Sequence, residues 1–368
     1  MASPRVSVLM PTHNRADVVG LAIRSVLDQT ISDFELLVVG DGCTDHTAGV
    51  VAAFADARIR WFDLPKAPGF GIANRNLALR QAQGEYIAFA PHDDLLFPDH
   101  LEKMLQLIER TDAEWCYSRP LWVSTDGVIV PFATNLHLAD ERRTFLEYGN
   151  SIPAICVVHR RSCFQTVGYW PEDVASAADW YLWRRIIQAG ARIANLEEPT
   201  TLHFVANWKK SRDSLSPVVG HLLTIADSAS WWPAILRTPV PQGQTEQSAM
   251  CEGIASNSNW YVDVRAACRL VIDRIFQDHT WNCHGIAPRI EAITAERDKA
   301  QREADSRGAT ITALVEERDK AQREAEVSRA IAAALRRRVD AMLQSHSWRI
   351  TASLRAAKTV AYRFFRRQ

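Results

Sequence analysis

Three short polar segments stand directly after apolar runs in the N-terminal part of this 368-residue sequence. They are Pro11, Thr12, His13, Asn14 and Arg15; Asp41 between Gly40 and Gly42; and His92, Asp93 and Asp94. An aspartate in such a loop can hydrogen-bond a ribose hydroxyl or a base N–H, and adjacent carboxylates can hold a hard divalent cation through oxygen. Each segment alone is also typical of an ordinary turn. Together they indicate a binding site, provided that the fold brings them to one edge.

The elements around these segments predict that arrangement. Apolar runs at 6–10, 34–39, 59–62 and 86–90 alternate with helical stretches, and Gly84 is expected to end the helix before the last run. Repeated strand–loop–helix units predict a mostly parallel sheet flanked by helices, an α/β fold. Ligands of such sheets sit beyond the carboxyl ends of the strands, where all three segments fall. The sequence lacks GxGxxG and GxxxxGK[ST], which disfavours dinucleotide and Walker-type phosphate loops.

The middle of the chain is more mixed. WCYS, GVIVPF and AICVVH look like strands, and ADWYLWRRIIQAG reads as an amphipathic helix that ends at Gly190. His203, Lys209 and Lys210 follow a probable edge strand; they could clamp a diphosphate, but we favour a solvated loop for them. Residues 217–288, with the probable helix VDVRAACRLVIDRIF, are interpreted as a helical extension.

The composition changes after Pro288. The nonamer ERDKAQREA occurs at 296–304 and again at 317–325, an offset of three heptads, and residues 289–343 contain no proline. Heptad counting puts Ala, Ile and Leu on one seam together with Arg297, Arg307 and Arg318. We favour a weak, oligomeric coiled coil over a single solvated helix.

The last residues combine aromatic and basic side chains. Six basic and no acidic residues lie between Ala341 and Gln368, beside Trp348, Phe364 and Phe365. Such a helix suits the surface of an anionic membrane. A frayed basic end, a helix packed on a partner and a nucleic-acid contact are the alternatives.

Composition and charge exclude several classes of protein. Hydrophobic residues make up 47% and charged residues 23%, which excludes a wholly disordered chain. Basic and acidic residues balance at 43 each, so net charge favours neither nucleic acid nor lipid as a partner. No apolar run is long enough for a membrane helix, and the first residues do not resemble a signal peptide. Seven scattered cysteines indicate reduced thiols in a cytosolic compartment.

Three segments together resemble family 2 glycosyltransferases, which have the GT-A fold. They are VSVLMPTHNRADVVGLAIRSVLDQTISDFELLVVGDGCTDHT, NRNLALRQAQGEYIAFAPHDDLLFPDHLEKM and ADWYLWRRIIQAGARIANLEEP, within about residues 5–215. The SWRITASLR tail looks like tails on some polysaccharide-building members. The resemblance implies an inverting, hexosyltransferase-like transfer of a sugar from a nucleotide-sugar donor to an acceptor hydroxyl, assisted by Mg²⁺ or Mn²⁺.

The resemblance also implies roles for individual residues. Donor binding falls on the residues that match the family's loops: Pro11, Thr12, Asn14, Arg15, Asp41, Arg75, His92 and Asp93. The DxD motif falls on Pro91, His92 and Asp93, so its first aspartate is missing, and Asp93 and Asp94 are the expected metal ligands. Asp179 is the expected catalytic base, although the family's Glu-Asp pair is here Ala178-Asp179.

We therefore predict four segments: a glycosyltransferase domain (1–216), a helical extension (217–288), a coiled coil (289–345) and a basic amphipathic tail (346–368). The protein is expected to take part in surface polysaccharide synthesis by adding a sugar to a glycan or lipid-linked acceptor. It is expected to be cytoplasmic, peripheral on the inner face of the membrane, and a homo-oligomer, with no nucleic-acid partner. Because Pro91 and Ala178 depart from the family's pattern, the alternative is a catalytically degenerate domain that acts as a scaffold or nucleotide-sugar-binding protein. A nucleotidyltransferase ranks lower, because PTHNR lacks a Gly- and Lys-rich signature.

Overall fold

The structure is a computed structural model that describes residues 3–132, 134–174, 176–205, 217–275, 277, 294–297, 299 and 311–344. Contacts divide the chain into two compact units. The first unit comprises Met1–Leu136 and Glu141–Val271, and the second comprises His137–Asp140 and Ile272–Gln368. The polar segments singled out above all belong to the first unit.

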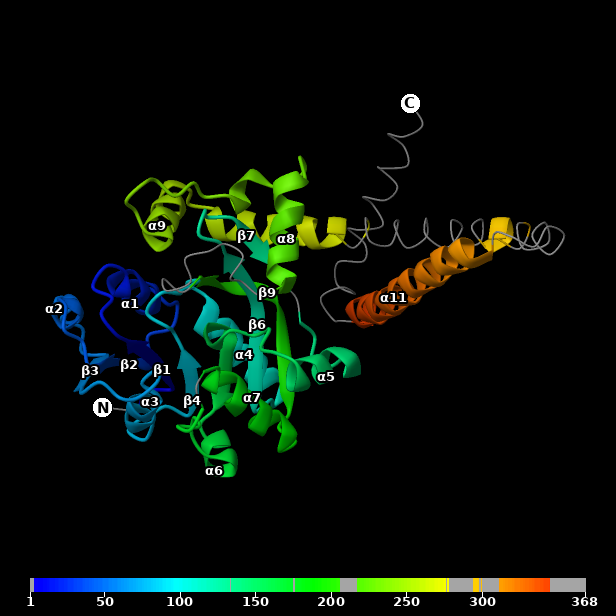
Figure 1. Cartoon of the computed structure of the whole chain (residues 1–368). Coiled ribbons are helices and arrows are strands. Elements are labelled where there is room, and N and C mark those ends of the chain that lie inside the picture. The colour runs from blue at the N-terminus through cyan, green and yellow to red at the C-terminus, as the bar shows by residue number, and fades with distance from the viewer. Residues whose placement is uncertain are drawn as a thin grey trace. The chain divides into compact units, whose positions relative to one another are not determined.

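The first unit contains one sheet with the strand order β3-β2-β1-β4-β8-β6-β9-β5, and β7 pairs with β6 (Figure 1). The strands are β1 (Val6–Thr12), β2 (Phe34–Asp41), β3 (Ile59–Leu64), β4 (Tyr86–Phe89), β5 (Leu95–Leu96), β6 (Trp115–Val123), β7 (Ile129–Pro131), β8 (Val157–Arg160) and β9 (Ile193–Phe204). Strands β3, β2, β1 and β4 are parallel neighbours, whereas β8 runs antiparallel to both β4 and β6. The predicted α/β fold is confirmed, and the sheet is mixed beyond β4.

Strands and helices alternate from Val6 to Phe89, as the sequence predicts, and further helices follow up to Gln188. The helices are α1 (Val19–Leu27), α2 (Thr47–Ala52), α3 (Ile72–Leu79), α4 (His100–Thr111), α5 (Ala139–Glu147), α6 (Cys163–Val167) and α7 (Ala178–Gln188). Helix α7 ends just before Gly190, whose φ of 87° is the left-handed conformation expected after a helix. A 3₁₀ turn (Ala154–Cys156) leads into β8.

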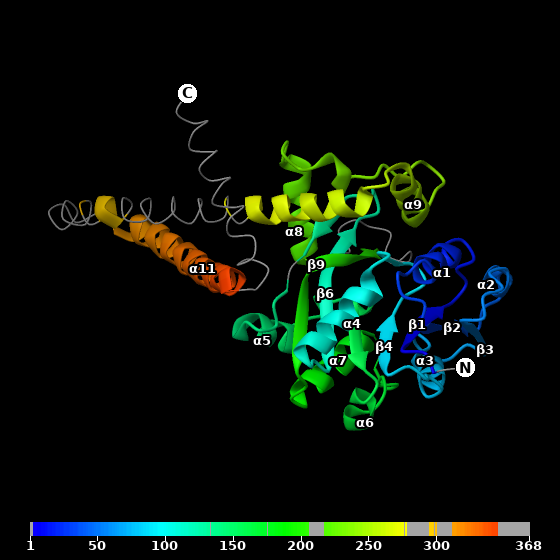
Figure 2. The same cartoon turned by 180° about the vertical axis from the view of Figure 1, so that it is seen from behind.

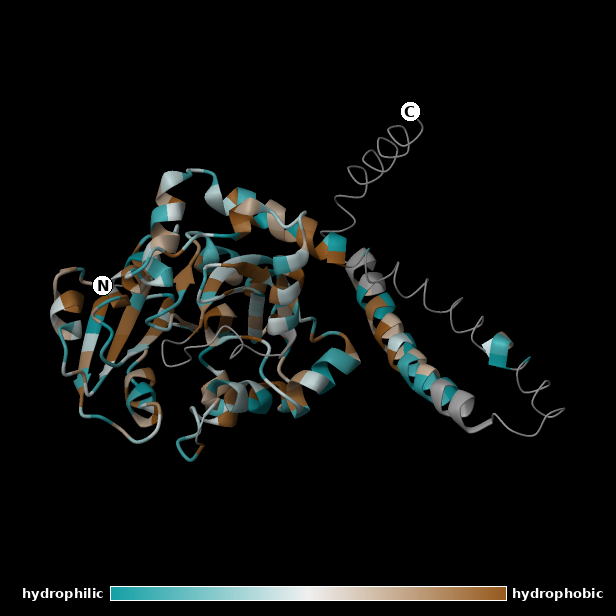
Figure 3. Cartoon of the chain, turned by 45° about the horizontal axis from the view of Figure 1, so that its top comes forward, coloured by the Kyte–Doolittle hydropathy of each residue, from teal (hydrophilic) through white to brown (hydrophobic). Residues whose placement is uncertain are grey.

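Helices cover both faces of the sheet (Figures 1 and 2). Consecutive residues of a strand point to opposite faces. On one face, the Trp115 ring lies 5.9 Å from that of Trp183 in α7. On the other, the Cys116 thiol lies 3.9 Å from the carbonyl oxygen of Met104 in α4. Apolar residues concentrate in the strands (Figure 3), and the residues of β2 are all buried. This explains why the strands read as continuous apolar runs rather than alternating ones.

The prediction that Gly84 ends a helix is wrong. Helix α3 ends at Leu79, five residues earlier, and Gly84 lies where the chain passes close to β1. A Cβ atom on Gly84 would stand 2.4 Å from the Ser7 backbone nitrogen and 2.6 Å from the Val6 carbonyl carbon. The Gly84 N–H also donates to the Ser7 hydroxyl at 2.8 Å. The glycine is thus required by close backbone packing.

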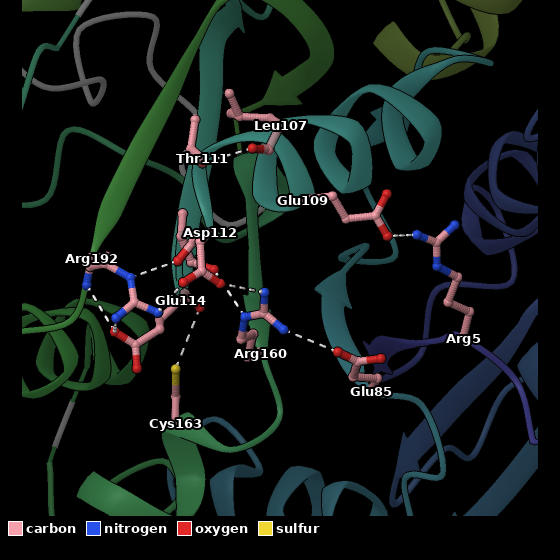
Figure 4. A network of polar contacts seen from close by, with 11 residues as sticks. Arg5, Glu85, Leu107, Glu109, Thr111, Asp112, Glu114, Arg160, Cys163 and Arg192 are labelled. Carbon is pink, nitrogen blue, oxygen red and sulfur yellow. Dashed lines mark hydrogen bonds and ion pairs between the residues drawn. The ribbon is translucent and has the colours of Figure 1, made fainter.

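A polar network joins the amino-terminal ends of β4, β6 and β9 (Figure 4). The Arg160 guanidinium contacts Glu85 at 3.1 Å and Asp112 at 3.2 Å. Arg192 contacts Asp112 at 3.0 Å, and its backbone N–H donates to Glu114 at 3.0 Å. These contacts tie the strand starts together at the edge opposite the one where the polar segments lie.

Residues 217–271 belong to the first unit together with the sheet. They form α8 (Pro217–Ser228), a 3₁₀ turn (Ala234–Leu236), α9 (Glu246–Ser256) and most of a helix over residues 260–275. Contacts therefore divide the chain near Val271, whereas the predicted boundaries at 216, 288 and 345 stay predictions.

In the second unit, α11 (Ile311–Gln344) is one unbroken helix of 34 residues. The proline-free composition predicts this continuity. The rest of the predicted coiled coil lies largely outside the described residues, and the basic tail does so entirely, so association and membrane binding stay predictions. Among the described residues, no helix combines the length and apolarity needed to cross a bilayer.

Replacing Gly84 with alanine should destabilise the protein by about 1–3 kcal/mol, because the new methyl group meets backbone atoms that cannot rotate away. The urea-unfolding midpoint measures the effect. Gly220→Ala is the matched control: a Cβ there meets nothing within 4 Å, and the helical position favours alanine by up to about 1 kcal/mol. Equal midpoints for the two variants would contradict the close-packing role.

Candidate active site

The predicted site residues line one cavity of about 920 Å³ in the first unit. It opens at the carboxyl ends of β1, β2 and β4, and the start of α7 and the end of β9 complete it. All ten lie in its wall: Pro11, Thr12, Asn14, Arg15, Asp41, Arg75, His92, Asp93, Asp94 and Asp179. The juxtaposition expected from the parallel sheet is therefore observed.

The loops after β1 and β2 are tied to each other by side-chain contacts. The backbone of Asn14 is in the left-handed region (φ 50°), and its side-chain oxygen accepts the Thr44 N–H at 2.7 Å. His13 Nδ1 lies 2.8 Å from the Asp41 carbonyl oxygen. The Thr12 hydroxyl is buried and has no hydrogen-bond partner within the described part of the chain. It is thus available to a ligand in the cavity.

Asp41 is buried and surrounded by donors. Its carboxylate accepts the Ala67 N–H at 2.8 Å and the Asn74 amide at 2.7 Å, and it pairs with the Lys66 ammonium. Burial raises the pKa of Asp41, but the Ala67 hydrogen bond and Lys66 outweigh it, so the pKa is lowered. Gly71 makes this packing possible, because a Cβ there would stand 2.5 Å from the Asp41 carboxyl carbon.

Arg75 reaches the cavity from α3. Its guanidinium donates to the Phe70 carbonyl oxygen at 2.9 Å and lies 5.3 Å from the centre of a Trp170 ring. Burial lowers the pKa of Arg75, although the charges of Asp179, Asp41 and Asp93 oppose that shift. Its Nε is buried and unpartnered among the described residues. A guanidinium in the cavity wall with an unused donor suits an anionic ligand.

The two adjacent carboxylates of the β4 loop differ in their surroundings. The Asp94 side chain is fully buried; His203 Nδ1 lies 2.9 Å from one oxygen, and the Phe204 N–H donates to the other at 2.9 Å. Asp93 is partly exposed, and its carboxylate lies 3.8 Å from Arg15 Nη1 and 3.9 Å from His92 Nε2, beyond hydrogen-bond distance. This favours an anchoring role for Asp94 and leaves the Asp93 oxygens available to a cation.

Asp179 lies in the first turn of α7, after Ala177 in the left-handed conformation (φ 55°). The Asn150 amide donates to its Oδ2 at 2.9 Å. Burial raises the pKa of Asp179, although the Trp180 N–H and the Arg75 charge act in the opposite direction. A carboxylate with a raised pKa is a better proton acceptor than an ordinary aspartate.

Several wall residues were not predicted, among them Lys66, Trp122, Asn150 and Trp170. The preference for a loop at His203 is wrong, because this residue belongs to β9 and pairs with Asp94. Burial lowers the pKa of His203, but the Asp94 charge more than offsets this, so the pKa is raised. Lys209 and Lys210 lie outside the described residues. A polar residue within an apolar strand was the available signal for His203, whereas nothing local marked Asn150.

The protein thus has an α/β fold with a cavity at the carboxyl ends of its parallel strands. Two adjacent carboxylates in the wall of that cavity differ in burial. Residues 7–162 match the model of glycosyl transferase family 2, so this part of the chain is a glycosyltransferase domain of that type.

Named relatives agree with that family. The chain is 29% identical over 185 residues to the UDP-Glc:alpha-D-GlcNAc-diphosphoundecaprenol beta-1,3-glucosyltransferase WfgD of Escherichia coli, covering 50% of this chain and 70% of that protein. It is 28% identical over 197 residues to TuaG of Bacillus subtilis, named for teichuronic acid biosynthesis, covering 53% and 77%. The solved S. aureus TarS 1–349 in complex with UDP-GlcNAc is 21% identical, with a TM-score of 0.49, covering 57% of this chain and 61% of that one.

Removing the imidazole with His203→Ala should cost about 3 kcal/mol, because it leaves the Asp94 carboxylate buried without its partner. Adding Asp94→Asn should recover part of the loss, because the uncompensated charge disappears. Urea unfolding of the two single variants and the double variant measures the coupling. Strictly additive losses would show that the pair does not anchor the loop.

Proposed function

We propose that this chain is an inverting glycosyltransferase that moves a sugar from a nucleoside-diphosphate sugar to an acceptor hydroxyl, with Asp179 as the base. The main support for this proposal is that Asp179 lines the same cavity as Asp41, Arg75 and Asp93. A donor sugar held by the strand loops would thus lie within the same space as the proton acceptor.

The donor half of the cavity is built from the loops after β1 and β2 and from α3. We assign the base and ribose to Thr12 and Asp41. The Thr12 hydroxyl can donate or accept a hydrogen bond there, and the ionised Asp41 carboxylate can accept one. Pro11, Asn14 and Arg15 shape the same wall. The diphosphate is assigned to Arg75, because its guanidinium lies in the cavity wall and its Nε has no partner among the described residues.

A Mg²⁺ or Mn²⁺ ion fits beside Asp93. The described residues contain no group of three or more His, Cys, Asp or Glu side chains placed to hold a metal, so the protein would supply one carboxylate, and the diphosphate and water the remaining oxygens. When bound, the ion would stabilise the charge that builds up on the leaving nucleoside diphosphate. Arg15 and His92 face the Asp93 carboxylate from beyond hydrogen-bond distance. Pro91 cannot provide the ligand that the first DxD aspartate would offer.

The acceptor hydroxyl loses a proton as its oxygen attacks the sugar carbon opposite the leaving nucleotide. Asp179 receives that proton, and its raised pKa matches the task. Asn150 holds the carboxylate in place by donating to its Oδ2. Inversion follows from a single displacement with the base and the leaving group on opposite sides.

The wider setting rests on the named relatives. Because WfgD is named for an acceptor on diphosphoundecaprenol and TuaG for teichuronic acid, we propose a surface polysaccharide as the product and a lipid-linked acceptor. A lipid-linked acceptor agrees with the predicted membrane-binding tail and a peripheral position on the cytoplasmic face. We also propose that the chain forms a homo-oligomer through the predicted coiled coil.

Asp179→Asn should lower kcat by about 10²–10⁴-fold, because the amide cannot accept the proton. The donor is first found by screening a panel of nucleotide sugars for hydrolysis. The matched control is Asp173→Asn, an exposed aspartate shortly before α7, which should keep full activity. In the wild type, kcat should fall as the pH drops through the raised pKa of Asp179, above the ordinary value of 3.8. A folded Asp179→Asn variant with full activity would contradict the assignment of Asp179 as the base.

Asp93→Ala should abolish the strengthening of UDP binding by Mn²⁺, because the variant removes the carboxylate that would hold the ion. Calorimetric titration with UDP and with GDP, with and without Mn²⁺, measures the difference. The metal-free titration is the internal control, since the residues assigned to the base are unchanged. If neither nucleotide binds the wild type at all, the scaffold alternative is favoured instead.

A further inference from the structure

A glutamine far along the chain contacts the candidate metal-binding loop. The Gln247 side-chain amide donates to the Asp93 backbone carbonyl at 2.9 Å, across 154 residues of sequence, and Gln247 is 3% exposed. Gln247 lies outside residues 7–162, which carry the family match. The contact therefore links a segment beyond the matched region to the carboxylate residue of the cavity.

The backbone of Gln247 is itself held in place. It occupies the second position of α9, and the Thr245 side chain caps this helix by accepting the Ser248 N–H at 3.2 Å. An N-cap of this kind fixes the first turn of a helix. The amide of Gln247 is thus presented from a defined position rather than from a loose loop.

A second contact from the same region holds the other end of the loop. Arg265, which is 8% exposed, contacts Asp99 at 2.7 Å and the Pro199 carbonyl oxygen at 3.0 Å. The rings of Trp260 and Tyr261 lie 5.8 and 4.8 Å from that of Phe97. Residues 245–265 therefore contact the segment 93–99 at both of its ends.

The position of Asp93 depends on the contacts from residues 245–265 because its side chain has few partners of its own. Its carboxylate lies at 3.8 Å or more from Arg15 and His92, so these contacts restrict it only weakly. Its direction is set by the main chain, which Gln247 holds at the carbonyl and Asp94 holds one residue later. Loss of the hydrogen bond from the Gln247 side chain to the Asp93 carbonyl would let the carboxylate move.

We propose that Gln247 is a positioning residue for Asp93, and that residues 245–265 are a working part of the transferase site rather than an independent extension. The proposal depends on the proposed glycosyltransferase function only for the identity of the ligand at Asp93. The positioning itself can be measured in the ligand-free protein.

The test compares Gln247→Leu and Gln247→Glu, which both remove the donor, with the full-length wild type. Gln244→Leu is the matched control, since Gln244 is exposed and its amide donates to Glu252 at 3.4 Å, with no other partner among the described residues. Hydrogen exchange of peptides covering residues 92–97 should be faster in both Gln247 variants. The Mn²⁺-dependent gain in UDP affinity should fall about tenfold, with metal-free UDP binding unchanged.

A purely structural role predicts another pattern, in which UDP affinity falls equally with and without Mn²⁺ and exchange rises throughout the first unit. That pattern, or wild-type exchange at 92–97 in both variants, would overturn the proposal. Should the wild type bind no UDP, the proposed function fails, while the exchange of residues 92–97 still decides whether Gln247 positions the loop.

Discussion

The architecture of the cavity depends on the buried contact of Asp94 with β9. A carboxylate with no solvent exposure is costly unless its oxygens are satisfied, and here the imidazole of His203 and the N–H of Phe204 do so. The contact joins the loop after β4 to a strand more than a hundred residues later. It closes the cleft on the side where the sheet turns from parallel to mixed, and it fixes the neighbouring Asp93 in place.

Around that anchor, acidic and basic side chains face one another in the wall of the cavity. Asp41 is held ionised by its donors, Asp179 is shifted toward the protonated form by burial, and Arg75 lies within the field of both. Carboxylates of the same type thus differ in their affinity for protons because their surroundings differ. The same principle allows one cleft to hold an anionic nucleotide and also to accept a proton.

The sequence was most informative where local patterns carry long-range consequences. The apolar runs before Pro11, Asp41 and Pro91 predicted parallel strands, and parallel strands necessarily bring their carboxyl ends together, so the donor side of the cavity could be predicted. Asp179 was reached only through a family resemblance. Asn150 and Gln247 were not found, because each acts through a single tertiary hydrogen bond that leaves no periodic trace. Gly84 was misread because close packing of the backbone and a helix end select the same residue.

The polar network at the starts of β4, β6 and β9 has a practical consequence. Its members Asp112, Glu85 and Arg192 have side-chain exposures of 74%, 62% and 58%, so each ion pair is screened by solvent and worth little by itself. The cavity mouth lies at the other edge of the sheet. A fluorophore or an immobilisation handle attached on this charged rim would leave the mouth unobstructed, so the protein could be tethered to a sensor surface with its cleft facing the solution.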